Sequence, residues 1–171
     1  MLRFVERCAA ILLVGVLCVP AGAKTHRKPH RPEPLKVQIA KLLADPAVAR
    51  AVGFLLETQR EDGGWGEDNE SYDTAPAGRY HRSNPSQTAW ALLGLMAAGQ
   101  AGHAAVLRGV AWLAAQQGRD GGWQEEPYTA VGFPRVFYLR YHGYKLFFPL
   151  LALARYRNLR QSNQRAVAWG F

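Results

Sequence analysis

The sequence contains little cysteine, and this scarcity excludes several kinds of site. Only two of the 171 residues are cysteines, Cys8 and Cys18, and both lie within the first 23 residues. If that segment is removed, the rest of the chain can form neither a disulfide nor a cysteine-ligated metal site. His81, His103 and His142 also lack metal-ligand spacing. We therefore expect no metal and no other cofactor.

The sequence also lacks, near its start, an apolar run long enough to cross a bilayer. Residues 8–19 are apolar, but a membrane-spanning helix needs about 20 such residues. Arg3 and Arg7 accompany this run, and Ala21-Gly22-Ala23 follows it. This order is typical of a secretory signal cleaved after Ala23, which implies export to the periplasm. A mis-assigned start codon is the alternative.

A basic stripe is missing too, although the formal net charge is +8. Five Lys or Arg residues lie between positions 24 and 36, against the single acidic residue Glu33. The rest of the chain shows no basic stripe interleaved with aromatic residues, and no helix–turn–helix, RRM or zinc-finger spacing. We therefore expect no nucleic-acid partner, and an anionic membrane surface is the remaining target for this charge.

The chain divides into four segments by composition. A signal-like segment covers residues 1–23, a basic, Pro-rich linker covers 24–44, one domain covers 45–158, and a tail without a clear pattern covers 159–171. Apolar spacing and helix-capping residues predict four helices within the domain. The first begins at Asp45-Pro46, the second runs from Asn84-Pro85 to Gly99, and the others cover about 104–117 and 144–158, with Pro149 kinking the last or delaying its start. A chain break is expected at Gly132-Phe133-Pro134.

The strongest single feature is an internal repeat. Residues 50–65 read RAVGFLLETQREDGGW, and residues 108–123 read RGVAWLAAQQGRDGGW. Each copy ends in the pattern Gln-x-x-x-Gly-x-Trp, which we call a QW turn. QW turn 1 has Gln59, Gly63 and Trp65, and QW turn 2 has Gln117, Gly121 and Trp123. Repeated helix pairs bury each other's faces, so the repeat predicts an all-α fold.

These residue types suit the end of a helix. A Gln amide can donate to and accept from neighbouring groups, and can therefore tie one helix end to the next helix. A glycine allows the chain to reverse with a positive φ. A Trp can then fold back over the junction and donate one N–H. We therefore expect both QW turns to be structural braces.

The repeat resembles the QW motif of triterpene cyclases. Two further segments, SQTAWALLGLMAAG (86–99) and GFPRVFYLRYHGYKLFFPLLALARYRN (132–158), are similar to the C-terminal region of squalene–hopene cyclases. The resemblance covers residues 46–158. It implies a partial (α/α) barrel, or toroid, of helix pairs, with squalene or a similar triterpene precursor as substrate, and it implies an enzyme associated with a membrane.

The resemblance also implies roles for five residues. Phe133, Phe137, Tyr141 and Tyr144 match positions that stabilise carbocations, and Leu139 matches a position that shapes the cavity. The residue types fit this chemistry, because an aromatic face attracts a cation without acting as a nucleophile. Without the resemblance, residues 133–148 would be interpreted as an ordinary aromatic core segment.

One part of the cyclase machinery has no match in the sequence. The family protonates an alkene with an Asp-x-Asp-Asp cluster, and none of Asp45, Asp62, Asp68, Asp73 or Asp120 falls at that spacing. We therefore expect the chain to be inactive unless the missing part of the cyclase is supplied as a partner. An exported helical module that binds a hydrophobic lipid or protein is the alternative. A prenyltransferase β-subunit would need a Cys-containing zinc site that the domain lacks.

Overall fold

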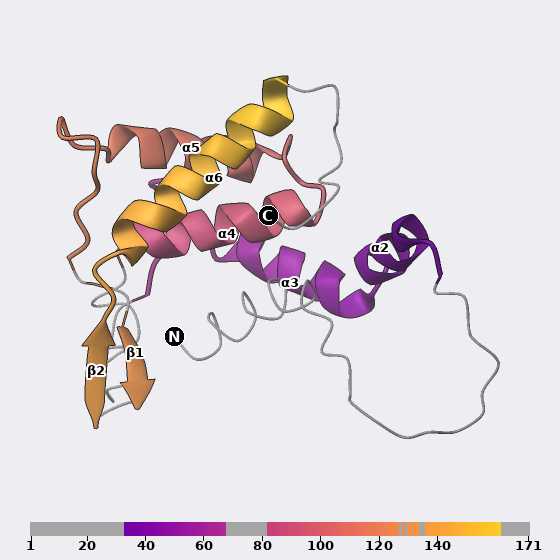
Figure 1. Cartoon of the computed structure of the whole chain (residues 1–171), viewed down its shortest axis with the longest axis horizontal. Coiled ribbons are helices and arrows are strands. Elements are labelled where there is room, and N and C mark those ends of the chain that lie inside the picture. The colour runs from indigo at the N-terminus through magenta and orange to yellow at the C-terminus, as the bar shows by residue number, and fades with distance from the viewer. Residues whose placement is uncertain (1–32, 68–81, 127, 129, 134–135, 162–171) are drawn as a thin grey trace.

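A computed structural model describes residues 33–67, 82–126, 128, 130–133 and 136–161. Within these ranges the chain forms five helices and one β-hairpin (Figure 1). The mostly helical architecture confirms the predicted fold class. The elements are α2 (Leu35–Leu43), α3 (Pro46–Glu57), α4 (Pro85–Ala97), α5 (Ala104–Ala115), β1 (Ala130–Phe133), β2 (Phe137–Arg140) and α6 (Tyr144–Gln161).

The starts of α3 and α4 follow from their capping residues. The Asp45 carboxylate accepts from the Ala47 N–H at 2.7 Å, and the Asn84 side chain accepts from the Gln87 N–H at 2.9 Å. A proline at the first position follows each cap, where its missing N–H costs nothing. Both predicted helix starts are confirmed.

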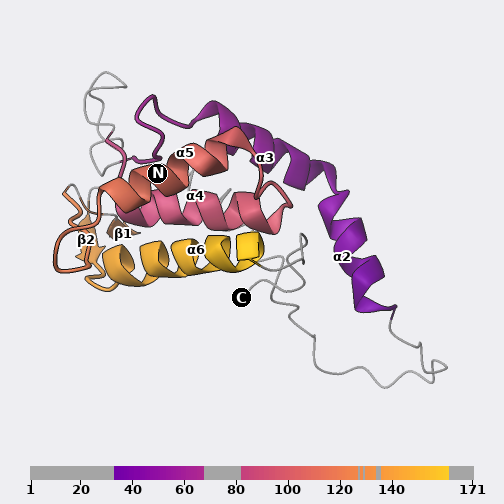
Figure 2. The ribbon, with the colours of Figure 1, turned by 90° about the horizontal axis from the view of Figure 1, so that it is seen from above.

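Helix α4 is the centre of the domain. It lies between α5 on one side and α6 on the other (Figure 2). Trp90 is its one residue between Pro85 and Met96 that is not buried, as expected for a helix that is apolar nearly all round. Gly99 closes the helix with φ +79°, and the Gln100 N–H donates to the Leu95 carbonyl at 2.9 Å. This Schellman arrangement confirms the predicted C-terminal glycine.

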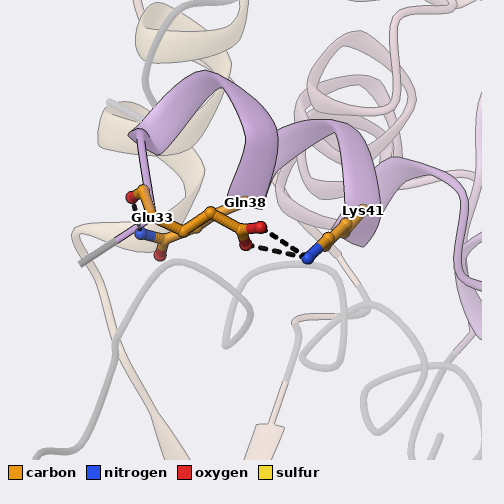
Figure 3. Close-up of polar contacts among 3 residues, drawn as sticks. All are labelled: Glu33, Gln38 and Lys41. Carbon is orange, nitrogen blue, oxygen red and sulfur yellow. Dashed lines mark hydrogen bonds and ion pairs between the residues drawn. The ribbon is translucent and has the colours of Figure 1, made fainter. Parts of the chain in front are cut away.

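Helix α2 corrects one sequence prediction. The segment 24–44 was expected to be a linker, but Leu35–Leu43 is helical. No residue of α2 is buried, and it points away from the other helices (Figures 1 and 2). Lys41 Nζ lies 2.7 and 2.9 Å from the carboxylate oxygens of Glu33, and Gln38 Nε2 donates to the Glu33 carbonyl (Figure 3). These contacts are exposed and add little stability.

The segment before α6 corrects a second prediction. Gly132 and Phe133, where a chain break was expected, lie in strand β1 of an antiparallel hairpin, in which Phe133 pairs with Phe137 and Ala130 pairs with Arg140. Pro134 lies outside the described residues. Helix α6 begins at Tyr144 although Pro149 lies inside it, and it ends at Gln161, three residues into the expected tail.

The signal-like segment and residues 162–171 lie outside the described residues. None of the described helices combines the length and the apolar character that a membrane crossing requires.

Two helical glycines provide a matched test of the packing between the helix pairs. A Cβ at Gly109 of α5 would lie 2.7 Å from the Trp65 ring and 2.9 Å from Leu92, whereas a Cβ at Gly53 of α3 meets nothing within 4 Å. We expect Gly109→Ala to lower the free energy of unfolding by about 1–3 kcal/mol through overpacking. Gly53→Ala is expected to raise it by up to about 1 kcal/mol, because alanine is the better helix former. Urea titrations of the two variants measure both changes in the free energy of unfolding. Equal changes for the two substitutions would contradict the close packing at Gly109.

Candidate functional site

The two QW turns have the same internal geometry. Gly63 has φ +92° and Gly121 has φ +80°. Gln59 Nε2 donates to the Gly63 carbonyl at 2.8 Å, and Gln117 Nε2 donates to the Gly121 carbonyl at 2.8 Å. In each turn the Gln side chain therefore closes the loop that the glycine opens. The positive φ of each glycine confirms the sequence prediction, whereas the predicted tie from the Gln to a neighbouring helix is present for Gln59 alone among the described residues.

The two Trp residues fold back onto the helix that precedes each turn. Trp65 Nε1 donates to the Leu55 carbonyl at 2.7 Å, and Trp123 Nε1 donates to the Leu113 carbonyl at 2.8 Å. The Trp65 ring is fully buried, and the Trp123 ring is 3% exposed. These carbonyls belong to the last turns of α3 and α5, which otherwise lack partners. Both Trp residues are structural braces, and neither faces an open surface.

Polar side chains fix QW turn 1 to the start of α4. Thr88 Oγ1 donates to the Trp65 carbonyl at 3.0 Å, and the Trp65 N–H donates to the same hydroxyl at 2.9 Å. The Gln87 side-chain amide exchanges two hydrogen bonds with the Glu67 backbone, at 2.6 and 2.8 Å. Gln87 and Thr88 are fully buried. Asp62 also accepts from Trp112 Nε1 at 3.1 Å and from Ser83 Oγ at 2.7 Å.

Two of the predicted site residues lie in an aromatic cluster between α4 and α6. The Tyr141 and Tyr144 rings stack with centroids 5.0 Å apart. Tyr144 also meets Trp90 and Phe148 edge-on, with centroids 5.5 and 5.2 Å away, and Trp90 lies 5.2 Å from Phe148. We call these four residues the aromatic cluster. The sequence analysis did not include Trp90 and Phe148 among the site residues.

The other three predicted residues lie on the hairpin. Phe133 and Phe137 face each other across the two strands, with ring centroids 5.4 Å apart. Phe137, Leu139 and Tyr141 alternate along an extended chain, so they share one side of it. Phe133, Phe137, Leu139 and Tyr141 are 45–66% exposed, whereas the intervening Tyr138 and Arg140 are half-buried. We call these four exposed residues the hairpin face, and Tyr141 connects it to the aromatic cluster.

Burial affects the chemistry of the aromatic cluster. It raises the pKa of Tyr144 above its usual value, and the neighbouring Tyr141 raises that pKa further. Tyr144 is therefore a neutral phenol throughout the physiological range. A neutral ring has an electron-rich face and no strongly nucleophilic oxygen, which is the property needed beside a carbocation.

Glu125 has a role that sequence reasoning missed. Its carboxylate is 4% exposed and accepts from both the N–H and the hydroxyl of Ser86, at the N-terminus of α4. A negative charge at this end of a helix stabilises it. Arg140 connects the same loop to the hairpin, through the Glu125 carbonyl and the Glu126 carboxylate, both at 3.2 Å. The position of Glu125 in the sequence gives no sign of this contact with α4, because Ser86 lies 39 residues away.

The described residues contain no group of three or more His, Cys, Asp or Glu side chains that could hold a metal ion. The one buried carboxylate among these residues is that of Glu125, and it already accepts a hydrogen bond from Ser86 at the N-terminus of α4. In the described part of the chain we therefore find aromatic and structural groups, and no candidate for a strong general acid.

The helix pairs and the QW turns agree with the helical fold that the resemblance to triterpene cyclases implied. The model of the squalene–hopene cyclase C-terminal domain matches residues 35–158, and the chain belongs to this family. The match begins where α2 begins.

The curated relatives are longer proteins. A squalene–hopene cyclase of Bradyrhizobium diazoefficiens is 58% identical over 133 residues, covering 74% of this chain and 19% of the relative. One of Zymomonas mobilis is 55% identical over 125 residues, with coverage of 72% and 19%. Mouse lanosterol synthase is 40% identical over 119 residues, with coverage of 70% and 16%. The chain thus spans about a fifth of the length of these relatives.

Proposed function

We propose that this chain supplies one wall of the reaction cavity of a triterpene cyclase that acts on squalene or a similar precursor. The observation that carries the proposal is the exposed hairpin face, continuous through Tyr141 with the aromatic cluster. Three large apolar side chains on one small hairpin, with Tyr141 directly after it, would normally be buried. Their exposure here is explained if they line a cavity whose other walls lie outside this chain.

The wall would act on the cation and not on the neutral substrate. Cyclisation moves a positive charge along the substrate, and the ring faces of Phe133, Phe137, Tyr141 and Tyr144 would stabilise it without reacting with it. Leu139, on the same side of the strand, would shape the cavity. The QW turns would hold this wall in place, since they fix the ends of α3 and α5 against their neighbours.

We also propose that the chain alone does not cyclise squalene. The sequence has no Asp-x-Asp-Asp cluster to protonate the alkene. The hairpin face is open to solvent, and water would capture a cation formed there. The partner that completes the site would be the remaining part of a cyclase, and the apolar substrate would reach it from a membrane surface.

Two preparations incubated with squalene test the proposal. The first is the purified chain, from which we expect no cyclised lipid. The second is a chimera, in which residues 35–158 replace the matching region of the Zymomonas mobilis relative, and from which we expect pentacyclic product. Product from the chain alone would contradict the proposed inactivity. A folded chimera without activity, beside an active parent enzyme, would contradict the proposed wall.

A further inference from the structure

The contact between QW turn 1 and the start of α5 joins two neighbouring helix pairs. Besides its bond to Gly63, Gln59 Nε2 donates to the Ala105 carbonyl at 2.8 Å. The Arg108 guanidinium donates to Gln59 Oε1. Ala105 and Arg108 are the second and fifth residues of α5. The junction therefore has two halves: a QW turn with its Gln, and a helix start with an alanine carbonyl and an arginine.

QW turn 2 provides the first half again, but it is open. In the part of the chain that the structure describes, the Gln117 side chain makes no hydrogen bond outside its own turn. Gln117 and Gly121 are exposed, whereas Gln59 is half-buried and Gly63 is buried. A Cβ on Gly63 would meet the Arg108 carbonyl at 3.1 Å, and one on Gly121 would meet nothing within 4 Å.

The start of α3 provides the second half, and it is open as well. Ala47 and Arg50 are the second and fifth residues of α3, as Ala105 and Arg108 are of α5. Ala47 is exposed while Ala105 is 2% exposed. Arg50 is exposed, and among the described residues it has no hydrogen bond and no ion pair.

We propose that these two open halves bind each other between copies of this chain. Gln117 of one copy would donate to the Ala47 carbonyl of the next, and Arg50 of that copy would donate to Gln117 Oε1. These are the same two hydrogen bonds as in the internal junction, with Gln117, Ala47 and Arg50 in place of Gln59, Ala105 and Arg108. Because the two halves lie on different parts of the chain, the contact is head-to-tail, and association continues beyond the dimer.

Two differences from the internal junction make the contact weaker. Ala51 stands where α5 has Gly109, and Ala51 and Trp123 are both already buried within the chain, so the new contact lacks the close packing of Gly109 on the Trp65 ring. Phe54 stands where α5 has Trp112, whose N–H binds Asp62 in the internal junction. We therefore expect association to be measurable between about 1 µM and about 1 mM.

Sedimentation equilibrium of the purified chain over this concentration range tests the proposal. We expect the mass to rise with concentration beyond that of a dimer. Gln117→Ala and Arg50→Ala are each expected to weaken association about tenfold or more, because each removes a hydrogen bond to or from a charged or amide partner. Gln116→Ala and Arg160→Ala are the matched controls and leave association unchanged. Circular dichroism confirms that each variant is folded.

A mixture of the two variants separates head-to-tail from symmetric pairing. The Gln117→Ala copy retains Arg50, and the Arg50→Ala copy retains Gln117, so an equal mixture has one intact junction per pair. It should form dimers with the affinity of the unaltered chain and stop there. A chain that stays monomeric at every concentration, or a mixture that associates no better than its components, would overturn the proposal. Either result would leave the proposed cavity wall untouched, because the chimera tests that wall separately.

Discussion

Trp65→Ala is expected to lower the free energy of unfolding by about 3–5 kcal/mol, the range for removing a buried aromatic side chain. Domains of this size are stable by about 5–15 kcal/mol, so the variant should lose a large fraction of its stability. The loss has two sources. The ring is fully buried between α3, α4 and α5, and its Nε1–H satisfies the Leu55 carbonyl at the end of α3. Thermal unfolding followed by circular dichroism measures the effect.

Trp65→Phe separates the two sources. Phenylalanine retains most of the apolar ring but leaves the Leu55 carbonyl without its donor, so we expect a loss of about 1–3 kcal/mol. Trp123→Ala is the matched variant in the second repeat. It should cost less than Trp65→Ala, because Gln117 and Gly121 beside it are exposed and free to close over the space. A loss below about 1 kcal/mol for Trp65→Ala would contradict the role of QW turn 1 as a brace.

The sequence predicted the braces well because their physics is local. Gln, Gly and Trp lie within seven residues, and each has a local role at a helix end. The Gln makes a polar contact, the Gly adopts a positive φ, and the Trp supplies a buried hydrogen-bond donor. The helix starts at Asp45 and Asn84 were predictable for the same reason. What could not be predicted was the other side of each contact, since Ala105 and Arg108 lie more than 40 residues beyond Gln59 and no rule of spacing connects them.

The hairpin and α2 were missed for different physical reasons. Strands of four residues give only two alternations of exposed and buried side chains, and Gly132 and Pro134 beside them are typical of a loop. Helix α2 follows a basic, Pro-rich stretch and buries no residue, so its composition resembles that of a linker. In both cases the neighbouring residues predicted a loop or linker, and the periodic pattern of the element itself was too short to indicate a strand or a helix.

The candidate site was predicted in part. The residues implied by the family resemblance do gather in two groups, Tyr141 with Tyr144 and Phe133 with Phe137. Trp90 and Phe148 complete the aromatic cluster, but they lie on different helices, α4 and α6, and more than 50 residues apart in the sequence. Trp90 also lies on a helix that is apolar nearly all round, where no pattern distinguishes one face from another. The packing of α4 against α6 decides which aromatic side chain remains at the surface.

Phe137→Leu in the chimera is the sharpest test of the proposed wall. Leucine retains an apolar side chain of similar size but has no electron-rich face. A cation held against an aromatic ring in a dry cavity gains about 2 kcal/mol. Losing that contact should lower kcat about 30-fold, since each 1.36 kcal/mol of barrier is about tenfold in rate. KM should change little, because squalene is neutral and the ring acts on charge that appears only during the reaction.

Two companion variants make the result specific. Phe137→Tyr keeps the aromatic face and should retain kcat within about threefold, since it preserves the cation–π contact. Phe147→Leu is the matched control, because Phe147 is a more exposed phenylalanine, on α6, outside both the hairpin face and the aromatic cluster. Early release of partly cyclised products from the Phe137→Leu chimera would mark the step at which the ring acts. Equal kcat values for Phe137→Leu and Phe147→Leu would show that Phe137 packs the hairpin and stabilises no cation.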